Sequence, residues 1–202
     1  MHISEGVLSP AVLGGGWVLA AAGTAMGLKR MDYDRLMTVA IMSAAFFVAS
    51  LIHVPVGVVS AHLILNGLLG AILGWAAFPA ILVGLLLQAV LFQYGGLAVL
   101  GVNTCTMAFA AALCGSLFHP FMVRGGRTGA VAAFLCGALG VGFAAALTAA
   151  SLALSGDVFV AAASGLLVMH VPVMVIEGLV TVFAVSFLAR VKPEALAERP
   201  AS

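Results

Sequence analysis

The sequence predicts an all-α integral membrane protein with about seven transmembrane helices. Of its 202 residues 7% are charged and 64% hydrophobic, and the mean hydropathy is +1.25. Residues 36–123 contain no Asp, Glu, Lys or Arg, which is enough helix for about four bilayer crossings. Lipid offers the backbone no hydrogen-bond partners, and the alternating pattern of a membrane barrel is missing. Helices are therefore the expected spanning elements.

The apolar segments predict one transmembrane domain, residues 1–202. The expected spans lie near residues 10–28, 35–53, 62–77, 79–94, 103–121, 128–154 and 161–189. Residues 1–9 form a polar N-terminal segment and residues 190–202 a tail. No Lys or Arg precedes the first span, which argues against a cleaved signal peptide. The third and fourth spans are short, as in helices that line a binding site.

The basic residues predict the orientation of the chain in the membrane. With seven spans, all eight fall on one side: Lys29, Arg30, Arg35, Arg124, Arg127, Arg190, Lys192 and Arg199. The positive-inside rule makes that side cytoplasmic. We therefore expect a multi-pass protein of the inner (plasma) membrane, with its N-terminus outside and its C-terminus in the cytoplasm.

The opening residues predict a metal site at the N-terminus. A free amine on Met1 followed by His2 offers the amine, the His2 amide and an imidazole, which together close two fused chelate rings on one ion. Nitrogen donors of this kind favour square-planar or tetragonal Ni(II) or Cu(II), and accept Co(II) where the protein imposes the geometry. Met1 is expected to be retained, because His2 is large for an aminopeptidase that removes the initiator residue.

His62 is the candidate for a fourth nitrogen donor. It lies at the expected outer start of the third span, where Asn66, one helical turn further, is expected to hold its second ring nitrogen. The alternative is an interfacial histidine whose partner is water. His53 is either a further ligand or a solvated histidine at a helix end, and Ser60 is a candidate for polar support of the site.

His170 and Glu177, two helical turns apart on the last span, form an alternative intramembrane site. They are either the ion or proton site of a secondary transporter or channel, or a structural hydrogen-bonded pair near a kink at Pro172. A membrane scaffold is a further alternative, which would need neither His2 nor His62. The three cysteines lack metal-site spacing and are expected to be buried hydrophobes. No nucleotide-binding loop or hydrolase motif is present, so the chain is not expected to be an enzyme.

Four local patterns, in this order along the chain, resemble the CbiM/NikM family of membrane-embedded substrate-binding subunits in energy-coupling-factor transporters for cobalt and nickel. They are Met1-His2-Ile3-x-Glu5-Gly6-x-Leu8; the loop that ends in His62-Leu63; Leu87-Gln88-Ala89-x-Leu91-Phe92 through Gly95-Gly96-Leu97 to Leu100-Gly101-Val102-Asn103 and Met107; and His170-x-Pro172 through Ile176-Glu177-Gly178. One departure is the loop at residues 54–61, which is poorer in Gly, Ser and Thr than the family's usual form.

The resemblance implies a function and a set of partners. The ion, Co(II) or Ni(II), would be bound by the Met1 amine, the His2 amide and imidazole, and the His62 imidazole, with Asn103 as possible support. The nitrogen set does not separate the two metals. The partners implied are a transmembrane coupling subunit and two ATPase subunits, with a small auxiliary membrane subunit as a possibility. The chain would lie in the lipid bilayer and bind no nucleic acid.

Overall fold

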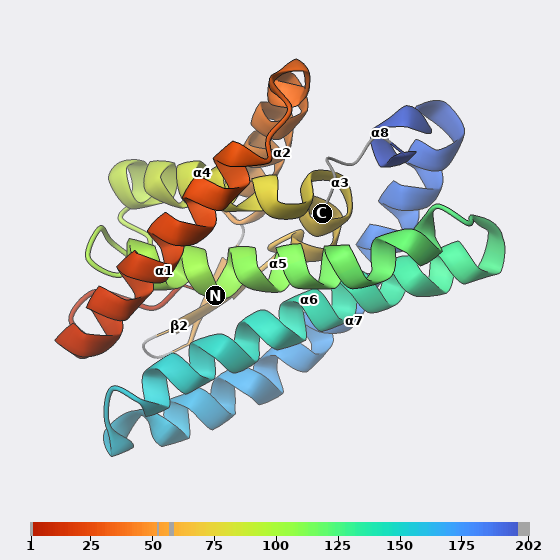
Figure 1. Cartoon of the computed structure of the whole chain (residues 1–202). Coiled ribbons are helices and arrows are strands. Elements are labelled where there is room, and N and C mark those ends of the chain that lie inside the picture. Colours follow the sequence, from red (N-terminus) through yellow and green to blue (C-terminus); the bar gives the residue numbers. More distant parts are fainter. Residues whose placement is uncertain (1, 52, 57–58, 198–202) are drawn as a thin grey trace.

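In the computed structural model the chain forms a helical bundle with one short β-hairpin (Figure 1). The structure describes residues 2–51, 53–56 and 59–197. The elements are α1 (Pro10–Lys29), η1 (Tyr33–Arg35), α2 (Leu36–Ala49), β1 (His53–Val56), β2 (Val59–His62), α3 (Asn66–Leu73), η2 (Gly74–Ala76), α4 (Ala77–Phe92), α5 (Leu100–Met122), α6 (Gly126–Ala153), η3 (Asp157–Phe159), α7 (Val160–Val191) and α8 (Glu194–Ala197).

Five helical runs in the described ranges are long and apolar enough to cross a membrane, which confirms the helical membrane class. They are Pro10–Lys29, Asn66–Phe92, Leu100–Met122, Gly126–Ala153 and Asp157–Val191. The expected third and fourth spans overlap the single run α3-η2-α4, in which Gly74 departs from helical geometry with φ +55°. Helix α2 has 14 residues, short of the roughly 20 that a full crossing needs. The count of seven spans and the orientation stay predictions.

The expected spans 35–53 and 62–77 each extend four residues beyond the helices into the connection near residue 55. Helix α2 ends at Ala49 and α3 begins only at Asn66, and between them β1 and β2 pair as an antiparallel hairpin with His53 opposite His62. The hairpin sequence is rich in valine and contains Pro55. Branched residues fit a strand, and proline disfavours helix both at its own position and at the residue before it.

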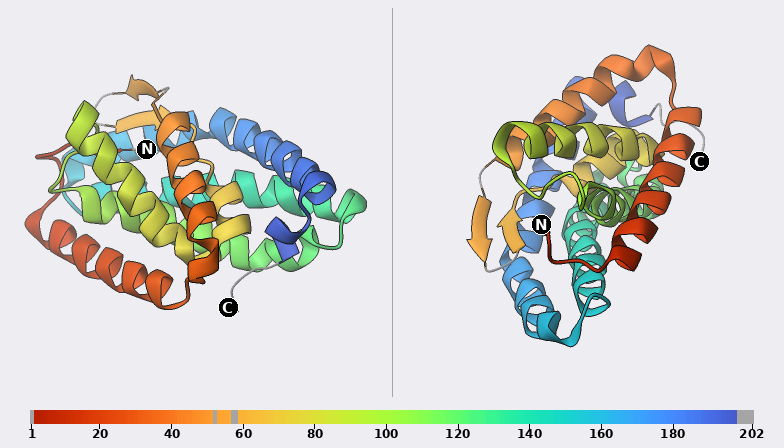
Figure 2. Two further views of the ribbon diagram at one scale, coloured as in Figure 1. Left: turned by 90° about the horizontal axis from the view of Figure 1, so that it is seen from above. Right: turned by 90° about the vertical axis from the view of Figure 1, so that its left-hand side faces the viewer.

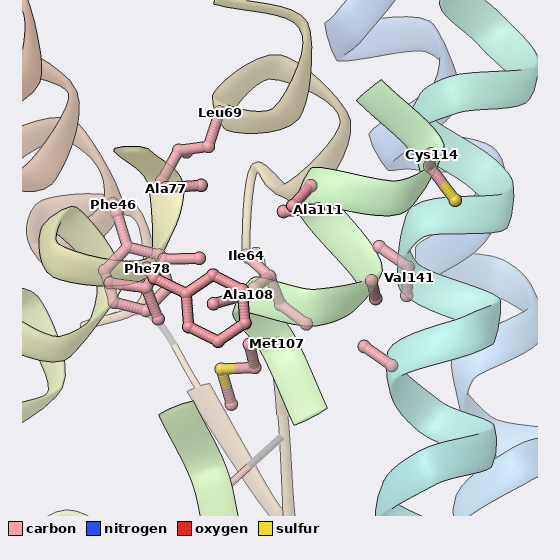
Figure 3. Close-up of a cluster of buried hydrophobic side chains, with 14 of the residues drawn as sticks. Phe46, Ile64, Leu69, Ala77, Phe78, Met107, Ala108, Ala111, Cys114 and Val141 are labelled. Carbon is pink, nitrogen blue, oxygen red and sulfur yellow. The ribbon is translucent and has the colours of Figure 1, made fainter. Parts of the chain in front are cut away.

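Helix α5 lies at the centre of the bundle. It packs against α1, α3, α4 and α6, while α7 runs beside α6 along the lower edge of Figure 1. Figure 3 shows the apolar cluster at this centre, where Phe46, Ile64 and Phe78 meet Met107 of α5. All four of these side chains are buried.

Glycines set the closest helix contacts. A Cβ on Gly70 of α3 would lie 2.0 Å from the carbonyl oxygen of Ala111 of α5, and one on Gly115 would lie 2.1 Å from the carbonyl oxygen of Gly70. Only glycine permits two backbones to approach so closely. Gly23 and Gly27 of α1 likewise face α4 and η2 at distances that leave no room for a side chain, so this small-residue face packs within the chain.

The two ends of α5 meet different parts of the chain. In its first turn Asn103 is hydrogen-bonded to Ile3 near the N-terminus. Near its last turn the Nε2 atom of His119 lies 2.7 Å from the carbonyl oxygen of Leu196 in α8, and Arg35 donates to another carbonyl of α8. The 16 residues between Asn103 and His119 correspond to about 24 Å of helix. The opening residues and the basic C-terminal region therefore lie at opposite ends of the bundle.

Candidate metal centre

Residues 2–8, here the N-terminal strap, lie against the start of α5. The side chains of Ile3 and Leu8 are buried. The Asn103 amide binds both sides of the Ile3 residue, because its Oδ1 accepts from the Ile3 N–H at 3.1 Å and its Nδ2 donates to the Ile3 carbonyl at 3.4 Å. Asn103 is itself 2% exposed. A buried side-chain amide thus holds the main chain directly after His2.

A second set of contacts ties the strap to the turn between α4 and α5. The Glu5 N–H donates to the Gly95 carbonyl at 3.1 Å, and the Glu5 carboxylate accepts from the Ala98 N–H at 2.8 Å. Gly96 takes φ +128°, and a Cβ there would lie 2.1 Å from Cγ of Glu5. A side chain at residue 96 would therefore displace the Glu5 carboxylate from the Ala98 N–H. The pair Gly95-Gly96 in the sequence is the signal that could have identified this contact.

The strap places the ring of His2 on the ring of His62. The two rings stack with their centroids 4.5 Å apart and their planes 20° from parallel, and each residue is 4% exposed. Figure 2 shows the start of the chain beside strand β2, which ends in His62. Two histidines 60 positions apart in the sequence thus share one buried site.

The hydrogen bond of His62 defines which ring nitrogen is available to a metal. Its Nδ1 lies 2.8 Å from the carbonyl oxygen of Leu63. A carbonyl oxygen only accepts, so Nδ1 carries the proton and Nε2 carries the lone pair. Nε2 is buried and has no hydrogen-bond partner among the described residues. Burial lowers the pKa of His62 well below its ordinary value of 6.5, so the ring is neutral at pH 7 and ready to coordinate.

The structure changes the predicted role of Asn66. Because His62 ends a strand and Asn66 begins α3, the two residues do not share a helix face. The Nδ1 of His62 binds the Leu63 carbonyl, and the Nδ2 of Asn66 donates to the Gly140 carbonyl at 3.4 Å. The expected hydrogen bond from Asn66 to His62 is therefore wrong, and main chain takes its place.

Of three other candidate residues, the structure describes the main chain of two. Met1 lies outside the described residues. The main chain of His53 stands opposite His62 in the hairpin, and Ser60 lies in the same strand as His62. Their possible roles at the site stay predictions.

The expected hydrogen-bonded pair of His170 and Glu177 is also wrong. Both are buried in α7, but the Nδ1 of His170 lies 2.7 Å from the Leu166 carbonyl, and the Oε1 of Glu177 accepts from the N–H groups of Ile64 and Leu65. The other nitrogen of His170 and the other oxygen of Glu177 have no hydrogen-bond partner within the described part of the chain. The partners of Glu177 are main-chain groups, which residue patterns do not reveal.

No group of three or more His, Cys, Asp or Glu side chains with metal-binding geometry is found among residues 2–51, 53–56 and 59–197. What the geometry does bring together is two imidazoles, His2 and His62, beside a main-chain segment that Asn103 and Glu5 hold in place.

Comparison with known proteins places this arrangement in a family. Residues 2–195 match the family described as CbiM, the cobalt uptake substrate-specific transmembrane region. The chain belongs to the CbiM family. A putative metal transport protein of Haemophilus influenzae is 45% identical, with 97% of each chain covered. The cobalt transport protein CbiM of Sorangium cellulosum is 31% identical over 97% of this chain and 94% of its own length.

Two further similar proteins extend the comparison. The fused nickel transport protein NikMN of Rhodobacter capsulatus is 30% identical over the whole of this chain, which covers 65% of that protein. A solved transition metal transporter has a TM-score of 0.83 and 28% identity, with 96% of this chain and 95% of that chain covered. The fold is therefore shared along nearly the full length of these 202 residues.

Proposed function

We propose that the chain is the substrate-specific membrane subunit of an energy-coupling-factor transporter that imports Co(II) or Ni(II). Membership of a family of cobalt and nickel transport components supports the substrate class. The single observation that carries the proposal is the buried stack of His2 on His62, with the lone pair of His62 Nε2 unused by any described residue. Imidazole nitrogen is a preferred donor for both ions.

The proposed donors are the Met1 amine, the amide and imidazole of His2, and Nε2 of His62. The hold of Asn103 on the Ile3 peptide supports this set, because it fixes the main chain next to the His2 amide. A donor set built from the first two residues binds an ion that has lost its water, and binding releases the protons of the amine and the amide. The ion is the transported substrate and does not stay with the protein.

In this proposal the strap faces the outside and the basic end faces the cytoplasm. The Lys and Arg residues that follow α1, α5 and α7 support that orientation. A transmembrane coupling subunit and two ATPase subunits would drive inward release, so ATP hydrolysis belongs to the partners. A small auxiliary membrane subunit is a possible further partner, and the fused nickel transport relatives support the expectation of an assembly.

The test is calorimetric titration of Ni(II) and Co(II) into purified protein with a native, untagged N-terminus. One ion should bind per chain, and both His2→Ala and His62→Ala should abolish binding. One residue added before Met1 should do the same without unfolding the bundle, because the amine is moved off the chelate. The matched control is His119→Ala, at the opposite end of α5, which should bind as wild type. Binding that survives His2→Ala and His62→Ala would reject the proposal.

A further inference from the structure

The carboxylate of Glu177 binds the main chain just beyond His62. Glu177 lies in α7 and is 0% exposed. Its Oε1 accepts hydrogen bonds from two consecutive main-chain N–H groups, those of Ile64 and of Leu65, the latter at 2.8 Å. Because a carboxylate is rare and costly within a membrane bundle, its presence at this position needs a specific reason.

The segment that Glu177 binds has an unusual backbone. Leu65 takes φ +55° and ψ +26°, a left-handed conformation that a leucine seldom adopts. This residue turns the chain from the end of β2 into the start of α3. Two successive N–H groups that point at one anionic oxygen form a compact anion-binding turn. The carboxylate therefore holds in place a turn that the leucine would not favour alone.

One peptide unit connects this turn to the ring of His62. The Leu63 carbonyl, which accepts from Nδ1 of His62, and the Ile64 N–H, which donates to Glu177, belong to the same planar peptide. The carboxylate, the peptide and the imidazole thus form a continuous line of hydrogen bonds. Hydrogen bonds in such a line polarise one another, and a negative group at its far end raises the basicity of the ring.

We infer that Glu177 is a positioning residue for the metal site, acting on His62 through the Leu63–Ile64 peptide. It touches neither the ion nor the imidazole. Its effect is to fix the direction of the His62 ring and to strengthen Nε2 as a donor, as carboxylates do for metal-binding histidines elsewhere. The inference rests on the proposed function, since it takes His62 to be a ligand.

Two variants of Glu177 separate its charge from its hydrogen bonds. Glu177→Gln keeps an acceptor oxygen for the two N–H groups and removes the charge, whereas Glu177→Leu removes both. Thr181→Val is the matched control, because Thr181 is equally buried one turn along α7 and its hydroxyl donates only within the helix, to the Glu177 carbonyl at 2.7 Å. Each variant is purified with a native N-terminus and titrated with Ni(II).

Glu177→Leu should weaken Ni(II) binding about 10- to 100-fold, the usual effect of removing a partner behind a ligand. Glu177→Gln should weaken it about three- to tenfold, because a hydrogen bond to a charged group is roughly twice as strong as one to a neutral group. The visible absorption bands of the Ni(II) complex at saturation should shift in both variants and stay unchanged in Thr181→Val. Packing alone would not move those bands.

Two results would decide against the inference in different ways. If wild type binds Ni(II) and His62→Ala does not, while Glu177→Gln shows the wild-type affinity and spectrum, Glu177 does not position His62 and the proposed function stands. If wild type itself does not bind, the proposed function fails and the inference fails with it. Glu177→Gln is the deciding variant should Glu177→Leu not fold.

Discussion

Asn103→Ala gives a direct measure of how strongly the N-terminal strap is held. The substitution removes the acceptor of the Ile3 N–H at 3.1 Å and the donor to the Ile3 carbonyl at 3.4 Å. Both groups of Ile3 lie in a buried region, where the Ile3 side chain is 0% exposed. They would be left without the partner that the side-chain amide provides.

The loss of docking free energy in Asn103→Ala follows from the cost of a buried main-chain group without a hydrogen-bond partner, about 1–3 kcal/mol. The shorter of the two bonds should account for most of that cost. In the proposed site the ion binds only when the strap is docked, so this energy lowers the apparent affinity, and the Ni(II) Kd should rise by up to about 5- to 150-fold. Binding is weakened but kept, because burial of the Ile3 and Leu8 side chains still populates the docked strap as a minor state.

Calorimetric titration of Ni(II) into Asn103→Ala measures this effect, with Thr104→Val as the matched control. Thr104 is the next residue, it is equally buried, and its hydroxyl has no hydrogen-bond partner in the described chain. Thr104→Val should therefore bind as wild type. A wild-type Kd for folded Asn103→Ala would show that the strap is not held by this amide, and would refute the link between strap docking and the metal site.

Two further predictions concern pH and packing. Since the pKa of His62 lies below 6.5 in the fold, the ring stays neutral between pH 8 and 6.5. The loss of Ni(II) affinity on acidification in that range should come from the amine, with an ordinary pKa of about 7.7–8.0, and from the amide. Protonation of His62 adds to the loss of affinity only at lower pH. A Ni(II) affinity that stays constant between pH 8 and 5.5 in calorimetric titrations would contradict the proposed donor set. Gly70→Val should lower the thermal unfolding temperature in detergent, by overpacking that costs about 1–3 kcal/mol or more, because a Cβ there would lie 2.0 Å from the Ala111 carbonyl oxygen. Gly14→Val, where a Cβ meets nothing within 4 Å, is the control, and equal unfolding temperatures would contradict the packing argument.

The long helices could be predicted closely from the sequence. The expected spans 10–28, 128–154 and 161–189 correspond to Pro10–Lys29, Gly126–Ala153 and Val160–Val191. Glu177 is the only Asp, Glu, Lys or Arg within these three expected spans, and their ends lie at or near basic residues, glycine or proline. Residues 50–65 could not be predicted in the same way, because a hairpin rich in valine is as apolar as a membrane helix. Hydropathy does not separate the two.

The site was predictable in part, and for a physical reason. In so apolar a chain each histidine costs free energy of desolvation, which makes His2 and His62 candidate ligands. The structure stacks their rings. The partners of His62 and Glu177 were not predictable, because they are main-chain groups. The Leu63 carbonyl replaces Asn66 as the partner of His62, and the amides of Ile64 and Leu65 replace His170 as the partner of Glu177. Every residue carries such groups, so only the path of the backbone selects among them.

The strap is held as a bound peptide is held by its receptor. Three kinds of contact hold it. Asn103 binds the N–H and the carbonyl of Ile3, the Glu5 N–H and the Glu5 carboxylate each make a hydrogen bond to the main chain of the α4–α5 turn, and the Ile3 side chain is buried. Tethering makes this an intramolecular association, with an effective concentration on the order of millimolar for a short linker. Modest contacts are then enough to keep the strap docked on the bundle. In the proposed site, lifting this one short segment would open the coordination sphere of His62 without separating the helices of the bundle.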